Sequence, residues 1–271
     1  MRNGTSAGTG AAGAAGRGDR DGALSTAWLT RFHPSPQAPV RLACFPHAGG
    51  SAPYYRPLSG LLAPSVEVLA VQYPGRLERY TEPLIDDVAQ LADLAAEALL
   101  PWTDRPLALF GHSLGASVAF ETARRLERAG VQPRALVVSA RRGPEVPHGE
   151  RVHTATEAEL VAYVRGLGGS GLEALDDPDL RELVLPAIRN DFRASETYTY
   201  RPGPDVSCPL LALAGADDHA ATPEKVAAWT GHTSGPARVK VLPGGHFYLD
   251  GHRETVAAEI RGLLAGTATT G

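Results

Sequence analysis

Six short apolar runs alternate with longer amphipathic stretches, and this alternation restricts the chain to a narrow class of folds. The runs are residues 40–45, 66–71, 107–110, 135–140, 209–215 and 237–242. They are rich in valine, leucine and alanine, as expected for strands buried on both faces. Between them, stretches such as 86–100 and 113–130 repeat apolar residues every three or four positions, which is typical of amphipathic helices. The pattern predicts an α/β fold with a mostly parallel central sheet and helices on both faces.

The alternation stops between residues 141 and 205. This segment holds two helical patterns, over 160–167 and 182–192, but no run typical of a strand. We predict a helical lid inserted over the C-terminal edge of the sheet. Residues 25–271 then form one domain, since α/β folds commonly reach this length without splitting. Residues 1–24 are nearly all small or charged, so we expect a disordered N-terminal tail.

Residues 111–115, with the sequence Gly-His-Ser-Leu-Gly, follow a strand candidate and open a helix candidate. Gly-x-Ser-x-Gly in this context is typical of a nucleophile elbow, a turn so sharp that side chains two positions from the serine would collide with neighbouring backbone. In a chain with 30 glycines the pattern alone is weak, so its strand-turn-helix context carries the prediction. We predict that Ser113 is a nucleophile. The alternative is a glycine-rich turn without catalytic function.

A serine hydroxyl needs a base to become nucleophilic, and that base needs a partner that fixes its tautomer. In the α/β-hydrolase fold the acid and then the histidine follow the serine, each after a strand. His246 follows the last strand candidate and is the predicted base, with His219 as its competitor. Asp218 follows the preceding strand candidate and is the predicted orienting acid, with Asp217 as its competitor.

Two backbone N–H groups are expected to bind the oxyanion formed during acyl transfer. One belongs to Leu114, directly after the predicted nucleophile. For the second we predict Ala48, in the loop 45–52, where two glycines leave backbone N–H groups accessible to a ligand. The alternative for this loop is an ordinary glycine-rich turn.

Composition argues against several other classes of protein. The net charge of -4 gives no basic excess for nucleic acid or an acidic membrane surface, and 43% hydrophobic residues argue against bulk disorder. No apolar run reaches membrane-spanning length and no secretion signal is evident, so we expect a cytoplasmic protein without membrane attachment. Cys44 and Cys208 lie in apolar runs and are predicted to be buried free thiols. We expect no metal and no cofactor.

The chain resembles the type II thioesterases that accompany polyketide synthases and nonribosomal peptide synthetases, over residues 32–264. The segments that carry the resemblance are CFPHAGGSA (44–52), VQYPGR (71–76), FGHSLGAS (110–117), SARRGP (139–144), LVLPAIRNDFRASETY (183–198), GADD (215–218) and GGHFYL (244–249). The resemblance implies the α/β-hydrolase fold and the same triad of Ser113, Asp218 and His246. One departure is visible: His219 stands where such proteins often have a proline, which leaves the shape of the acid loop open.

The resemblance implies hydrolysis of acyl thioesters on the phosphopantetheine arm of acyl or peptidyl carrier proteins, which removes misprimed or stalled chains through an acyl-serine intermediate. The arm belongs to the carrier-protein substrate, so no cofactor is expected in this chain. Arg76, Arg79, Arg141 and Arg142 are candidates to contact its phosphate or an acidic carrier surface; the alternative is solvated surface arginines. Open alternatives for the function are a small-molecule esterase or lipase, a cyclising release domain, and a binding protein without catalysis.

Overall fold

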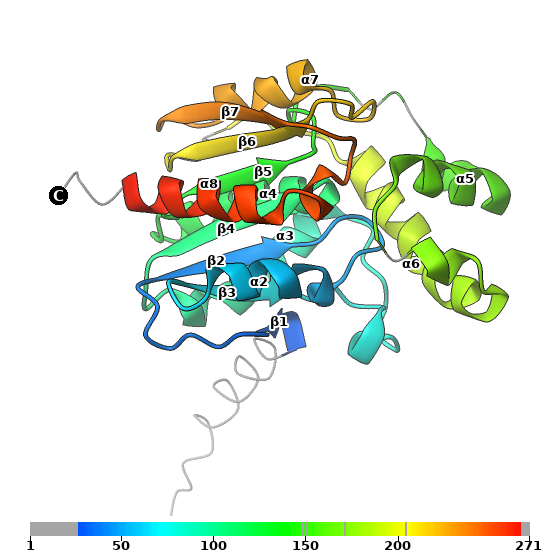
Figure 1. Ribbon diagram of the computed structural model, residues 1–271, viewed down its shortest axis with the longest axis horizontal. Helices are drawn as coiled ribbons and strands as arrows, with labels where there is room; N and C mark the ends of the chain where they lie inside the picture. The colour runs from blue at the N-terminus through cyan, green and yellow to red at the C-terminus, as the bar shows by residue number, and fades with distance from the viewer. Residues whose placement is uncertain (1–26, 148, 150, 171, 204, 267–271) are drawn as a thin grey trace, which may run out of the picture.

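The computed structural model describes residues 27–147, 149, 151–170, 172–203 and 205–266. The tail predicted over residues 1–24 lies outside this part of the chain. The strands of the described ranges are β1 (Leu29–Thr30), β2 (Val40–Phe45), β3 (Val66–Val71), β4 (Leu107–His112), β5 (Leu136–Ser139), β6 (Leu210–Gly215) and β7 (Ala237–Leu242). They form one sheet in the order β1-β3-β2-β4-β5-β6-β7 (Figure 1).

Every neighbouring pair of strands is parallel except β1 and β3. The predicted α/β class with a mostly parallel sheet is therefore confirmed. All six expected strands are present, and their ends fall within two residues of the apolar runs. The edge strand β1 was not predicted, because a strand of two residues is too short to show an alternation of apolar and polar positions.

The helices are α2 (Arg56–Leu62), α3 (Val88–Leu99), α4 (Leu114–Arg128), α5 (Glu157–Leu167), α6 (Pro178–Thr197), α7 (Pro223–Ala227) and α8 (Arg253–Gly266). Shorter 3-10 turns occur at η1 (Ala52–Tyr55), η2 (Leu77–Arg79), η3 (Leu100–Trp102), η4 (Val152–Thr154), η5 (Leu172–Leu175), η6 (Ala228–Gly231) and η7 (Tyr248–Asp250). Helices α2 and α8 cover one face of the sheet, and α3 and α4 cover the other (Figure 1).

Alternate residues of the central strands enter two separate apolar cores, as the period of two along a strand requires. One core joins α3 and α4 to strand residues that include Ala43, Leu69, Leu109, Val138 and Ala212. The other core joins α2 and α8 to the adjacent strand residues, whose side chains point to the opposite face of the sheet, among them Leu42, Val68, Phe110, Val137 and Leu211. Cys44 and Cys208 are buried free thiols, as predicted. These two cores make the sheet a rigid platform for the loops at its ends.

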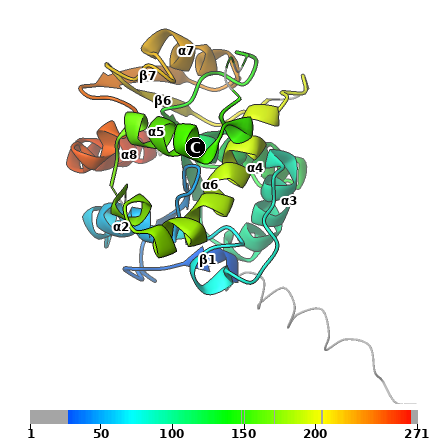
Figure 2. The same ribbon diagram turned by 90° about the vertical axis from the view of Figure 1, so that its right-hand side faces the viewer.

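Between β5 and β6 the described residues contain helices but no strand. Helices α5 and α6 form over the two predicted helical patterns and lie across the C-terminal ends of the strands (Figures 1 and 2). Helix α6 begins where Asp177 accepts hydrogen bonds from the N–H groups of Asp179 and Leu180, with a proline at its first position. A small apolar core of its own holds this lid together, made of Val152, Leu160, Leu175, Leu185 and Ile188.

None of the helices in the described ranges has the length and apolar character needed to cross a membrane.

Candidate active site

Strand β4 passes directly into α4 through a turn at Ser113. This residue has φ 55° and ψ -121°, a conformation that costs a residue with a side chain about 1–3 kcal/mol. The flanking glycines permit the turn, because a Cβ on Gly111 would lie 2.1 Å from the carbonyl oxygen of Gly115, and a Cβ on Gly115 would lie 2.1 Å from that of Phe45. Both collisions are with backbone, which has little freedom to move. The local sequence therefore lifts the hydroxyl of Ser113 above the sheet edge.

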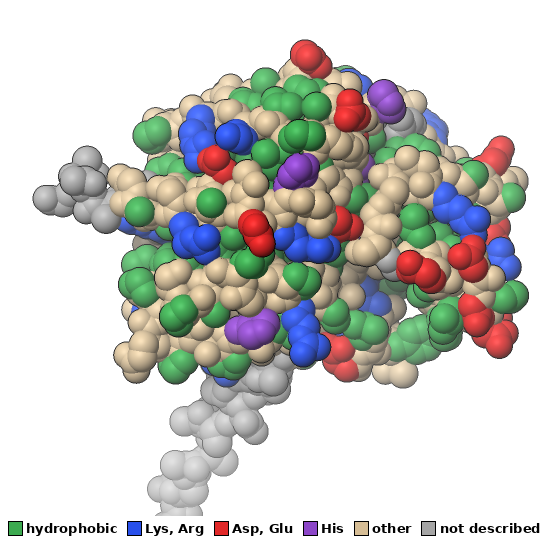
Figure 3. Space-filling view, in the orientation of Figure 1, with side chains coloured by type: hydrophobic (Ala, Val, Ile, Leu, Met, Phe, Trp, Pro, Cys, Tyr) green, Lys and Arg blue, Asp and Glu red, His purple; other side chains and the backbone are tan. Residues whose placement is uncertain are grey.

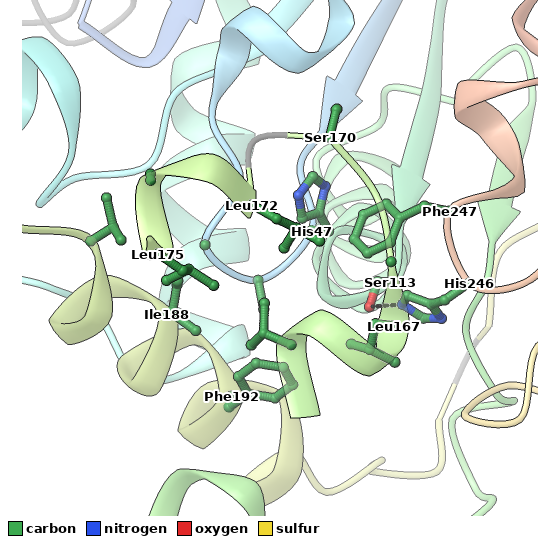
Figure 4. A pocket seen from close by; sticks show the side chains of 16 residues that line it. His47, Ser113, Leu167, Ser170, Leu172, Leu175, Ile188, Phe192, His246 and Phe247 are labelled. Carbon is green, nitrogen blue, oxygen red and sulfur yellow. Dashed lines mark hydrogen bonds between the residues drawn. The ribbon is translucent and has the colours of Figure 1, made fainter. Parts of the chain in front are cut away.

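The structure brings together the three residues that the sequence selected from distant positions. His246 Nε2 lies 2.9 Å from Ser113 Oγ (Figure 4). His246 Nδ1 lies 2.8 Å from a carboxylate oxygen of Asp218. Because a carboxylate only accepts hydrogen bonds, the proton of the neutral imidazole belongs on Nδ1. Nε2 is then free to accept the hydrogen of the Ser113 hydroxyl. The arrangement can remove a proton from the serine and stabilise the resulting imidazolium.

Of the two candidate aspartates in the loop 216–222 after β6 (the acid loop), Asp218 is the one that contacts His246. Asp218 is 3% exposed, and its second oxygen accepts hydrogen bonds from the N–H groups of Ala220 and Ala221. Asp217 and His219 are exposed to solvent. The turn is thus closed by the carboxylate of Asp218, and with His219 at the next position this carboxylate is still directed at the imidazole.

The loop 243–247 after β7, which carries His246, is the base loop. Backbone contacts at the ends of β6 and β7 join it to the acid loop. The N–H of Asp217 donates to the carbonyl of Gly244. A Cβ on Gly215 would lie 2.3 Å from the carbonyl oxygen of Gly245, so only glycine allows the two loops this approach. The hydrogen bond between acid and base is therefore set by the backbone around them.

Two further histidines lie near His246: the ring of His112 is next to that of His246, and the ring of His47 is next to that of His112. Desolvation lowers the pKa of His47 to about 3, and the charges of His246 and Arg76 act in the same direction. Burial also lowers the pKa of His112, whose Nδ1 is 2.9 Å from Ser139 Oγ. Both rings are thereby kept neutral, and among the described histidines His246 is the one within hydrogen-bonding distance of the nucleophile candidate.

The two predicted oxyanion donors lie in segments that flank Ser113. Leu114 is the first residue of α4, so its N–H has no acceptor within the helix. Ala48 lies in the loop after β2 and lines a cavity together with Ser113 and His246. The positive end of the α4 dipole faces the same place. This end of the sheet can accommodate a developing negative charge.

The cavity beside Ser113 has a volume of about 120 Å³ and is mostly apolar (Figure 4). Its apolar lining includes residues of the lid and of the base loop: Val164, Leu167, Leu172, Leu175, Val184, Ile188, Phe192 and Phe247. A lid was predicted, but its contribution to this wall was not. The spacing of Val184, Ile188 and Phe192 along one face of α6 was the available signal.

A second, smaller cavity is also lined by Ser113 and His246. Arg141, Arg142 and Glu196 contribute to its lining and also to that of an adjoining outer groove. Two cavities therefore reach the reacting atoms, one mostly apolar and one lined partly by charged and polar groups.

The four arginines singled out in the sequence are buried, each 6–8% exposed. The alternative that they are solvated surface residues is therefore wrong. Arg76 and Arg79 are each paired with a carboxylate and are not available to a phosphate. Arg141 donates to the hydroxyl and carbonyl of Ser195 on the lid, and Arg142 donates to backbone carbonyls. Contact of Arg141 or Arg142 with a substrate stays a prediction.

The thioesterase domain family matches residues 40–264. A probable cadicidin biosynthesis thioesterase of Streptomyces griseus is 47% identical over 251 residues, covering 90% of this chain and 70% of that protein. Thioesterase PikA5 of Streptomyces venezuelae is 48% identical over 242 residues, covering 89% and 86%. The type II thioesterase BorB from the borrelidin biosynthetic cluster superposes with a TM-score of 0.82 at 46% identity, covering 88% and 98%. This chain belongs to the thioesterase family and is a serine thioester hydrolase of the α/β-hydrolase fold.

Proposed function

We propose that this protein hydrolyses acyl thioesters on the phosphopantetheine arm of acyl or peptidyl carrier proteins and so clears misprimed or stalled polyketide or nonribosomal peptide assembly lines. The observation that carries the proposal is the hydrogen-bonded chain from Ser113 through His246 to Asp218 at the mouth of an apolar cavity. Similarity to thioesterase PikA5 and to the type II thioesterase BorB from the borrelidin biosynthetic cluster supports the substrate class.

In the first half of the reaction, Ser113 Oγ attacks the thioester carbonyl carbon while its proton passes to His246 Nε2. Asp218 stabilises the imidazolium, and the N–H groups of Ala48 and Leu114 hold the oxyanion. The carbon–sulfur bond then breaks. The conjugate acid of the leaving thiolate has a pKa near 8.5, so the thiolate leaves with little assistance from His246 as a general acid. The departing thiolate takes the proton from His246 Nε2, so the products are an acyl ester of Ser113, the free thiol of the arm and a neutral His246.

In the second half, a water molecule gives a proton to His246 Nε2 and attacks the acyl ester. The tetrahedral intermediate uses the same two N–H groups, and its collapse returns the proton to Ser113 Oγ and releases the carboxylic acid. Both halves need only residues of this chain, so we propose that no cofactor takes part. No group of three or more potential metal ligands occurs among the residues that the structure describes.

The two cavities provide separate places for the two parts of the substrate. We assign the acyl group to the apolar cavity of about 120 Å³. Since an apolar cavity of about 150 Å³ holds benzene, this volume suits acyl groups of roughly five carbons or fewer. The arm is assigned to the second, more polar cavity and the adjoining groove, past Arg141 and Arg142. Burial and the neighbouring Arg142 lower the pKa of Arg141 to about 10, which still leaves it charged at neutral pH.

The proposed partner is the carrier protein that brings the arm. The outer surface of the lid is rich in exposed acidic side chains (Figure 3), namely Glu157, Glu159, Glu173, Asp176, Asp177, Asp179 and Glu182. An acidic carrier surface would be repelled there, so we place its approach beside the groove and not across the lid. A cytoplasmic location remains an expectation from the sequence.

A comparison of thioesters with oxygen esters tests this function. Carrier proteins bearing acetyl, propionyl, hexanoyl and decanoyl groups are incubated with the enzyme, and release of the free thiol is followed beside hydrolysis of p-nitrophenyl esters of the same acids. The proposal predicts a higher kcat/KM for carrier-bound thioesters, greatest for the shorter acyl groups. A marked preference for the oxygen esters would contradict it and favour a small-molecule esterase.

A further inference from the structure

The lid helix α6 contributes a buried carboxylate to the loop that carries the predicted oxyanion donor. Asp191 is 1% exposed, and one of its oxygens accepts a hydrogen bond of 2.8 Å from the N–H of Gly49. Arg76 binds both oxygens of the same carboxylate, at 2.5 and 2.9 Å, and also donates to the carbonyl of Gly50. Asp191 is thus bound by the loop 45–52, the oxyanion loop, and by Arg76, which itself donates a hydrogen bond to that loop.

A second contact joins α6 to the same loop one helical turn earlier. Ile188 packs against Gly49 so closely that a Cβ on this glycine would lie 2.5 Å from Ile188 Cγ1. Gly49 also has φ +73°, a conformation that favours glycine. Figure 4 shows Ile188 lining the same cavity as His47 of this loop. The lid and the oxyanion loop therefore meet along a face of α6, with an apolar and an ionic contact side by side.

These contacts fix the peptide groups on both sides of Ala48. The carbonyl of His47 accepts a hydrogen bond from the N–H of Gly50, and this carbonyl shares a planar peptide with the N–H of Ala48. The next peptide carries the N–H of Gly49, which donates to Asp191. With a positive φ at Gly49, the turn matches type II, whose central peptide is reversed relative to type I. Asp191 accepts the N–H that only this orientation presents to the lid.

We propose that Asp191 is a positioning residue that couples closure of the lid to assembly of the oxyanion hole. With α6 seated, the carboxylate holds the turn 47–50 in the conformation that aims the N–H of Ala48 at the oxyanion. With α6 displaced, Arg76 and the N–H of Gly49 lose their shared acceptor, and the turn is free to relax. Stabilisation of the tetrahedral intermediate is thereby restricted to the closed enzyme. The inference rests on the proposed function, because the oxyanion forms only during the proposed acyl transfer.

The test compares Asp191→Ala and Asp191→Asn with a matched control, Glu82→Ala. Glu82 pairs with Arg79 in the segment after β3, as Asp191 pairs with Arg76, but its carboxylate is not bound by the oxyanion loop. The kcat and KM for butyryl-pantetheine are measured, together with the affinity for butylboronic acid. This probe forms a tetrahedral adduct with the serine and places an oxygen where the oxyanion develops.

Losing one aligned oxyanion donor costs about 10²-fold in kcat, so Asp191→Ala is expected to approach this loss while KM changes less than about threefold. Boronic acid affinity falls in parallel with kcat. Asp191→Asn recovers part of both, because its amide oxygen still accepts from Gly49, and Glu82→Ala changes neither. A kcat within about threefold of wild type in Asp191→Ala, or a lowered kcat with unchanged boronic acid affinity, would overturn the proposal.

Loss of one partner of a buried ion pair can prevent folding. The double variant Arg76→Met/Asp191→Leu removes both charges together and replaces them with apolar groups of similar size. Its kcat and boronic acid affinity should fall as in Asp191→Ala, and wild-type values in the folded double variant would contradict the inference. If the wild-type enzyme prefers oxygen esters, the proposed carrier function fails. The same comparison made with an ester still decides the role of Asp191.

Discussion

The rim of the sheet and the lid above it supply the active site by different physical means. At the rim, Ser113, Asp218 and His246 follow strands whose two apolar cores fix them in place. The lid has one small core of its own, and polar contacts such as Asp191 with Arg76 and Ser195 with Arg141 join it to the rest of the protein beside apolar ones. The rim therefore holds the chemistry in a fixed geometry, and we expect the lid to be the more mobile part, which shapes the acyl cavity.

The largest expected effect belongs to the rim. Ser113→Ala removes the attacking oxygen and should lower kcat for acyl-pantetheine about 10⁶-fold, as for nucleophiles that act within a triad. The variant should still bind substrate, because the cavity is unchanged. Thiol release under saturating substrate measures the loss, and fluorophosphonate labelling reports the nucleophile independently. Equal labelling of wild type and variant would favour a binding protein or another nucleophile.

The orienting acid comes next in size. Asp218→Asn keeps the shape of the loop but can donate to His246 Nδ1, which favours the wrong tautomer of the imidazole. We expect kcat to fall about 10⁴-fold with little change in KM. Asp217→Asn, at the exposed neighbouring position, is the matched control and should retain activity. The comparison of the two aspartates fails if both variants lose activity equally.

A stability effect is expected at His47, where the oxyanion loop meets the lid. Folding lowers the pKa of His47 from its ordinary value of 6.5 to about 3. At a pH between these two values, the unfolded chain therefore binds a proton at this residue that the folded protein does not. Stability should therefore be full above about pH 6.5 and decline below it, by up to about 2 kcal/mol at pH 5 from this residue alone. Denaturant unfolding at pH 7 and pH 5 measures the difference. His47→Gln should flatten this dependence and the exposed His219→Gln should not; identical slopes would contradict the assignment.

The smallest expected effect concerns the acyl cavity. Val184→Ala shortens a side chain of the lid that lines the cavity and so enlarges the cavity. The preference should shift toward acyl chains one or two carbons longer, with a change of about tenfold in the ratio of kcat/KM for the longer chain to kcat/KM for the shorter one. The neighbouring Leu183 is 47% exposed, so Leu183→Ala serves as the control on the same helix. Chain-length profiles of carrier-bound acyl groups measure the shift. An unchanged profile in Val184→Ala would place the acyl group outside this cavity.

The same contrast explains what the sequence could predict. Residues at the ends of parallel strands share one edge of the sheet, so chain order alone placed Ser113, Asp218 and His246 together. Helical periodicity predicted α6 but carries no information about the element that it faces. The contact of Asp191 with Gly49, 142 positions away, depends on how the lid docks, and for that reason it was missed. Arg76 was expected near substrate or solvent for the same reason, because its partner lies on the lid.

An acyl ester at Ser113 is the intermediate on which the proposed reaction depends most. Mass spectrometry of the enzyme, quenched in acid within one turnover of propionyl-pantetheine, tests this directly. We predict a propionyl group on the peptide that contains Ser113, its disappearance on further incubation, and no adduct in Ser113→Ala. Thiol release at the wild-type rate with the acyl group on another residue, or in Ser113→Ala, would contradict the account.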